Sequence, residues 1–259
     1  MKPDAGNRHD SSDSEVTNVA AKKVEGLDTP GTGISEAEGR FETRIGRTLV
    51  YPRRVAVLAT VLAAGAVIID ALICLYRPWH LHVYRMTLAI SGVVCLLCLA
   101  RGDLASIGLV LRPRRGFRHW IWATALIGVG LVLLLCLICV YYRLTHTPPR
   151  FVLALESALR LLAGHCVYYP LVEELLYRVV LCTPLVALLG PWYAIVVSGV
   201  AFGGLHVLYG NPAPTNLVAG YLLAWAYIRS DSILVPIVWH SLGNAAILVF
   251  QVVAWYVMQ

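Results

Sequence analysis

Residues 119–142 read HWIWATALIGVGLVLLLCLICVYY, and this stretch decides the class of fold. It contains no Asp, Glu, Lys or Arg. An apolar run of about 20 residues is long enough to cross the hydrocarbon core of a bilayer. Inside lipid the backbone must satisfy its own hydrogen bonds, which a helix does. The stretch therefore predicts a transmembrane helix.

The rest of the chain has the same character from residue 48 onward. The sequence is 58% hydrophobic and only 14% charged, which is too little charge to cover the surface of a soluble domain of this length. We expect an all-α, polytopic transmembrane helical bundle over residues 48–259, with about seven spans. The expected spans are 55–76, 83–100, 119–142, 151–171 continuing towards 189, 191–209, 214–229 and 233–257. The stretch 151–189 is predicted to be one long or broken helix whose second half is buried by its neighbours.

Residues 1–47 are rich in Ser, Asp, Glu, Gly and Lys, and such a segment buries too little apolar surface to offset its ordering entropy. We expect a disordered cytoplasmic tail. Arginines gather on one side of the predicted spans, which indicates a cytoplasmic N-terminus, a plasma (inner) membrane location and contact with anionic lipid headgroups. The opposite side is assigned Arg77, Arg85, Arg143 and Arg150. Nucleic acid is not an expected partner, because no basic stripe with interleaved aromatic residues lies outside the spans.

Three predicted spans contain polar groups, although an ionisable side chain at the centre of a membrane costs about 2.5–3.5 kcal/mol on insertion scales. They are PLVEELLYRVV (170–180), AFGGLHVLYG (201–210) and PIVWHSLGNAA (236–246). On a helix Glu174 and Arg178 are four residues apart and are therefore predicted to pair. Such a pair would neutralise one carboxylate of the segment.

Glu173 lies about 100° round the helix from Glu174 and shares a face with Tyr177. It has no basic residue four positions later, so we expect its carboxylate to be free to act as a general base. In the last span His240 and Asn244 share a face, and both can donate hydrogen bonds to a developing oxyanion.

Less specific interpretations exist for each of these features. A lone intramembrane His is more often a hydrogen-bond partner between helices than a catalyst, and a Glu–Arg pair is often a structural clasp. Polar residues in spans also occur in small transporters and proton relays. The convergence of a free Glu, two His and an Asn from three spans favours an enzyme.

The three motifs also resemble a known family when they are taken together and in order. EELLYR (173–178), FGGLH (202–206) and HSLGN (240–244) are similar to the E-E-x-x-x-R, F-x-x-x-H and H-x-x-x-N motifs of the CAAX protease and bacteriocin-processing (CPBP, or Abi) family. The resemblance at motif level lies within residues 170–245. It implies an intramembrane endopeptidase of the glutamic or metallo type.

The resemblance also implies a role for each motif residue. Glu173, with His206, would activate a water for attack on a peptide bond, and His240 with Asn244 would stabilise the oxyanion. The supporting residues would be Glu174, Arg178, Phe202 and Tyr177, the first two holding the first motif in place.

The resemblance supports a glutamate mechanism that requires no cofactor. Zinc is the alternative, because Glu173, His206 and His240 could together bind a divalent metal. The implied partner is a membrane-anchored protein or peptide substrate, such as a prenylated C-terminus, a bacteriocin leader or a sorting-signal tail. The alternative function is non-catalytic, as a bacteriocin self-immunity or membrane peptide-binding protein.

Overall fold

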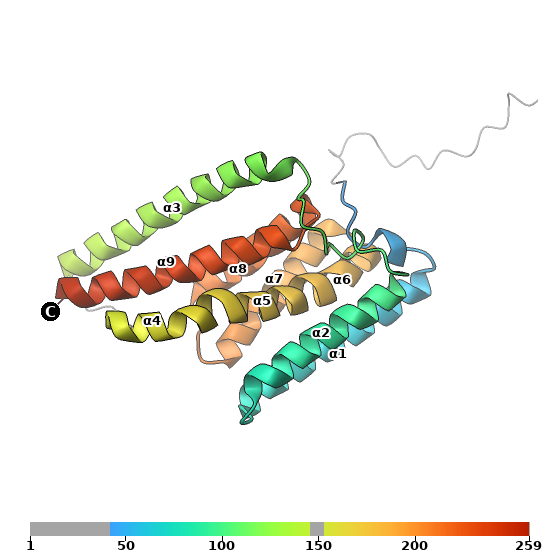
Figure 1. Ribbon diagram of the computed structural model, residues 1–259, viewed down its shortest axis with the longest axis horizontal. Helices are drawn as coiled ribbons and strands as arrows, with labels where there is room; N and C mark the ends of the chain where they lie inside the picture. The colour runs from blue at the N-terminus through green and yellow to red at the C-terminus, as the bar shows by residue number, and fades with distance from the viewer. Residues whose placement is uncertain (1–41, 146–152, 259) are drawn as a thin grey trace, which may run out of the picture. The chain divides into compact units, whose positions relative to one another are not determined.

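The computed structural model describes residues 42–145 and 153–258, and within this part of the chain the fold is helical without a strand (Figure 1). The predicted all-α class is confirmed. The elements are η1 (Arg47–Leu49), α1 (Arg53–Tyr76), α2 (Leu81–Leu99), α3 (Gly116–Thr145), α4 (Leu155–Ala163), η2 (Gly164–Tyr168), α5 (Tyr169–Glu174), η3 (Leu175–Cys182), α6 (Thr183–Leu189), α7 (Pro191–Leu208), α8 (Pro214–Ser230) and α9 (Leu234–Met258).

The helices follow the predicted spans closely. Five of them, α1, α2, α3, α7 and α9, are long and apolar enough to cross a membrane. The other two helical stretches are α8, which has 17 residues, and the chain from Leu155 to Leu189, which carries the charged first motif. The protein is therefore an integral membrane protein.

The stretch from Leu155 to Leu189 is one broken helix, as predicted. Segments of α-helix (α4, α5 and α6) alternate with two π-helical segments, η2 and η3, which flank the Glu173–Glu174 pair. Its second half, from Val172 to Val186, is almost completely buried. Short π-helical insertions are rare and occur frequently at functional sites.

A stripe of small residues on α1 explains this burial. Ala56, Ala59, Ala63 and Ala66 recur at helical spacing, and all four are buried. Small side chains let helix backbones approach closely inside a membrane protein, and here α1 packs against α2, α6 and η3 (Figure 1). The next residue on the same face is Asp70, so its carboxylate points into the protein rather than toward lipid.

A second close approach joins α7 to α8. A Cβ atom added to Gly220 of α8 would lie 2.7 Å from the carbonyl oxygen of Gly199 in α7, so this crossing requires glycine. Gly203, one turn after Gly199, is similarly close to the backbone of Leu217. This packing fixes the turn of α7 that carries Phe202 and His206.

Most of the predicted tail, residues 1–41, lies outside the described residues. The remaining residues of that prediction, 42–47, are packed on the helices. Two donors of this stretch bind the carboxylate of Asp231. The Thr43 hydroxyl donates to it at 2.5 Å and the Arg44 backbone amide at 2.7 Å. The Gly46 amide donates to the Ser106 carbonyl, and Ile45 is buried. This short stretch is part of the folded unit.

Candidate active site

Glu174 and Arg178 form the predicted ion pair. Nε of Arg178 lies 2.9 Å from Oε2 of Glu174, and both side chains are completely buried. Arg178 also donates from Nη1 to the Ser198 hydroxyl at 2.9 Å, and its guanidinium lies 5.0 Å from the centre of the Phe202 ring. The pair therefore fastens the first motif to α7, the helix that carries the second motif.

Glu174 has a second partner that helical spacing does not reveal. Its Oε1 atom lies 2.9 Å from Nδ1 of His240, which comes from α9. A carboxylate only accepts, so Nδ1 carries the hydrogen of this bond. The bond fixes the orientation of the imidazole ring and turns Nε2 toward Glu173. Glu174 thus contacts residues of α9 as well as its own helix.

Glu173 has no basic residue four positions later, but the expectation that its carboxylate is therefore free is wrong. Its Oε1 atom lies 3.5 Å from Nη1 of Arg85, a residue of α2, and its side chain is 8% exposed. The spacing rule finds partners only on the same helix, whereas Arg85 reaches Glu173 across a helix–helix contact. Arg85 itself lies near the start of α2 and is buried.

The third motif approaches Glu173 through His240. Nε2 of His240 lies 3.8 Å from Oε2 of Glu173, and the His240 side chain is 9% exposed. One imidazole ring therefore faces both glutamates of the first motif, with a hydrogen bond to Glu174 and a longer separation from Glu173. The structure brings Glu173, Glu174 and His240 together as a group.

His206 stands at the edge of this group. Its Nδ1 donates to the carbonyl of Phe202 at 2.8 Å, so that in the neutral ring Nε2 is an acceptor. Among the described residues, no carboxylate oxygen lies within 4 Å of its ring nitrogens. The Phe202 ring contacts both histidines, with centroids 4.5 Å from His206 and 5.6 Å from His240, and meets the Tyr177 ring edge-on.

Asn244 lies one turn after His240 on α9, as predicted. Its amide donates to the backbone carbonyl of His165 at 2.7 Å. His165 belongs to the π-helical segment η2. A side-chain amide carries two hydrogens, so one remains for another acceptor after this bond is made.

The three side chains that could bind zinc do not form a ligand group. In the described part of the chain, no three His, Cys, Asp or Glu side chains lie close enough together to hold a metal ion. His206 is turned to its own helix, and the Arg85 guanidinium lies beside Glu173. These positions do not fit a Glu173–His206–His240 metal site.

Sequence reasoning did not include Asp70 and Arg85 in the site. Nε and Nη2 of Arg85 donate to the two oxygens of Asp70 at 2.7 and 3.1 Å. Asp70 of α1 therefore bonds to the neighbouring helix α2. A signal for the pair existed, because Asp70 is near the end of one predicted span and Arg85 near the start of the next. A tight turn between two antiparallel helices places the end of the first helix beside the start of the second.

The part of the chain that contains the three motifs is similar to a known family. Residues 154–246 match the model of a family described as Type II CAAX prenyl endopeptidase Rce1-like. The chain carries an Rce1-like domain. The match is consistent with the CPBP family that the three motifs indicated. It begins beside α4, ends within α9 and contains all three motifs. No curated protein and no solved structure matches the chain.

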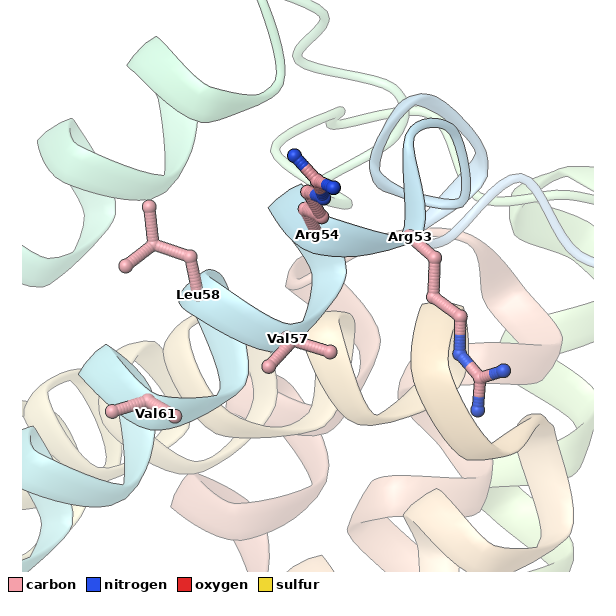
Figure 2. Close-up of a pocket in the computed structure, with 5 residues that line it drawn as sticks. All are labelled: Arg53, Arg54, Val57, Leu58 and Val61. Carbon is pink, nitrogen blue, oxygen red and sulfur yellow. The ribbon is translucent and has the colours of Figure 1, made fainter.

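The surface hollow that Figure 2 shows is not lined by residues of the Rce1-like domain. Five residues at the start of α1 line that hollow, and none of them belongs to the site: Arg53, Arg54, Val57, Leu58 and Val61. The two arginine side chains point in different directions (Figure 2). The hollow is therefore not the place where the polar residues of the three motifs meet.

Proposed function

We propose that the protein is an intramembrane endopeptidase that hydrolyses a peptide bond in a membrane-presented protein or peptide, in the manner of a CAAX-type prenyl protease. The family match and the apolar helices support a membrane-embedded protease. One observation carries the proposal. His240 faces Glu173 and Glu174 at the same time, at 3.8 and 2.9 Å, inside a largely buried group.

In the proposed reaction Glu173 takes a proton from a water molecule as the water oxygen bonds to the substrate carbonyl carbon. His206 assists through its free Nε2. The oxyanion of the tetrahedral intermediate accepts hydrogen bonds from Nε2 of His240 and from the remaining amide hydrogen of Asn244. The carbon–nitrogen bond then breaks, the proton on Glu173 passes to the leaving amine, and Glu173 returns to its carboxylate form.

The oxyanion role requires His240 to carry hydrogen on both ring nitrogens, because Nδ1 already donates to Glu174. The charges around the ring suit this form. Three carboxylates (Asp70, Glu173 and Glu174) and two guanidinium groups (Arg85 and Arg178) leave one negative charge when all are ionised. A protonated His240 balances that charge. Glu174 is then the counter-ion of the imidazolium as well as the partner of Arg178.

The proposal is tested with purified protein in detergent and a farnesylated peptide that ends in a C-a-a-X sequence. Wild type should release the last three residues, whereas Glu173→Ala, His206→Ala and His240→Ala should each abolish cleavage and still insert and fold. The same peptide without the farnesyl group tests whether the lipid is recognised. Wild-type cleavage by any of the three variants would refute the site.

Substrates other than a prenylated terminus require an open search. Termini of membrane proteins are compared between cells with wild-type protein and cells with the Glu173→Gln variant. A terminus present only with wild type identifies a substrate and its cleavage position. Full activity after exhaustive chelation would support the reaction without a metal.

A non-catalytic role, in self-immunity or in binding a membrane peptide, is the second candidate. The observation that favours it is the absence of direct contact between His206 and any carboxylate in the described residues. A binding protein would retain its biological effect in the Glu173→Gln variant, whereas a protease would lose it.

A further inference from the structure

Asp70 of α1 and Arg85 of α2 form a buried ion pair outside the segment that matches the family. Nε and Nη2 of Arg85 each bond to a different oxygen of Asp70, and the two side chains are 4% and 0% exposed. Two parallel bonds of this kind fix the plane of a guanidinium group. The Arg85 guanidinium is thus held in one orientation, whereas a single hydrogen bond would leave it free to rotate.

The third nitrogen of the same guanidinium is directed at the first motif. Nη1 of Arg85 lies 3.5 Å from Oε1 of Glu173, while Oε2 of Glu173 lies on the side of His240, 3.8 Å from Nε2. The two oxygens of Glu173 therefore have different neighbours. Arg85 occupies one oxygen, and the other faces the histidine.

We propose that Asp70 and Arg85 are positioning residues that hold the Glu173 carboxylate so that Oε2 is the oxygen presented to the attacking water. The proposal rests on the proposed function, in which Glu173 is the general base. Asp70 has a second effect, because it holds the Arg85 guanidinium closer to its own carboxylate than to that of Glu173. The base is oriented by Arg85 without being tied into a short ion pair.

Two tyrosines hold Asp70 in its part of this arrangement. The hydroxyl of Tyr177 donates to Oδ2 of Asp70 at 2.9 Å, and that of Tyr209 is directed at the same oxygen at 3.4 Å. Tyr177 is a residue of the first motif, so the motif contacts α1 as well as α7. With these bonds the Asp70 carboxylate has partners on α2, η3 and the end of α7.

The Arg85→Lys variant separates positioning from charge. Lysine keeps the positive charge, but a single ammonium group cannot reproduce the fixed fork that binds Asp70 and reaches Glu173 together. We expect kcat for the farnesylated C-a-a-X peptide to fall about 10- to 100-fold, because a displacement near 1 Å has effects of this size. KM should stay within about twofold, because a pair that acts only through Glu173 affects the chemical step and not substrate binding.

The Asp70→Asn/Arg85→Gln double variant guards against misfolding. It removes both charges of the pair, so neither charge is left buried without the other. We expect folded protein, judged by size-exclusion chromatography and melting temperature, with the same low kcat as Arg85→Lys. The control is Arg143→Gln, which removes an exposed arginine near the end of α3 and should leave kcat and melting temperature unchanged.

Glu173→Gln is assayed in parallel so that the two proposals fail in distinguishable ways. If Glu173→Gln is as active as wild type, the proposed function fails. If it is inactive while Arg85→Lys or the folded double variant has wild-type kcat, the positioning role is overturned. Failure of both Arg85 variants to give any folded protein would assign the pair to folding alone and would also overturn it. If wild type does not cleave the farnesylated peptide, the same variants are compared on the substrate found from membrane-protein termini.

Discussion

Nδ1 of His240 lies 2.9 Å from Oε1 of Glu174, whose other oxygen pairs with Arg178. A residue that holds its own helix in place therefore also holds the imidazole of α9. The Glu174 carboxylate thus has a structural partner, Arg178, and a partner in the proposed chemistry, His240. Variants can separate these two roles.

The Glu174→Gln/Arg178→Met double variant tests the chemical role of Glu174. It removes both charges of the buried pair, so its free energy of unfolding should be close to that of wild type. His240 nevertheless loses its counter-ion, and we expect kcat to fall about 10²-fold, the size of effect seen when oxyanion stabilisation is impaired. Wild-type kcat in the folded double variant would show that Glu174 acts only as a clasp.

The Arg178→Met single variant should instead unfold easily. It leaves Glu174 as a completely buried carboxylate without its guanidinium partner, which costs about 3–5 kcal/mol. We expect a lower melting temperature and a lower yield of folded protein. The matched control is Arg160→Met, which breaks another pair four residues apart, Glu156–Arg160, at 4.0 Å in an exposed position. That change should alter stability by less than about 0.5 kcal/mol.

Asn244→Ala should lower kcat by about 10²- to 10³-fold, because one of the two proposed oxyanion donors is lost. It also removes the bond to the His165 carbonyl, so its melting temperature is measured alongside the rate. Asn216→Ala is the control, since Asn216 likewise donates to a backbone carbonyl, that of Asn211, but lies outside the three motifs. Equal losses of activity in the two variants would argue against a specific role for Asn244.

Truncation at the N-terminus should show a sharp boundary. Removal of residues 1–41 should leave kcat and melting temperature unchanged. Removal of residues 1–47 also deletes the hydrogen bonds to Asp231 and Ser106, and leaves the buried Asp231 carboxylate without two donors. We expect a loss of about 1–3 kcal/mol in stability for the longer deletion. Equal melting temperatures for the two truncations would contradict the packing of residues 43–46.

Regular spacing made part of the site predictable. The Glu174–Arg178 pair follows from a separation of four residues on a helix, and the shared face of His240 and Asn244 follows in the same way. The glycine at position 203 is a comparable feature, because its missing side chain lets α8 pack against α7. These features depend on one helix or on the absence of a side chain, both of which can be read from residue order.

Contacts between different helices could not be predicted from the sequence in the same way. Arg85 reaches Glu173 because α2 packs against α5 and η3, and no spacing rule reports that distance. The bond from Asn244 to His165 depends on a π-helical turn, which has no clear signature in the residues themselves. Helical periodicity therefore gave the faces of the motifs, while their partners on other helices required the packed structure.

The alanine stripe of α1 has a consequence for protein engineering. It leads directly to Asp70, so the alignment of the first motif depends on residues far upstream of the matching segment. The segment 154–246 should accordingly not behave as an exchangeable module. A chimera that joins it to the first helices of another protein would keep every motif residue and still lose the counterpart of the Asp70–Arg85 pair, and recovery of its function would require that pair to be transplanted as well.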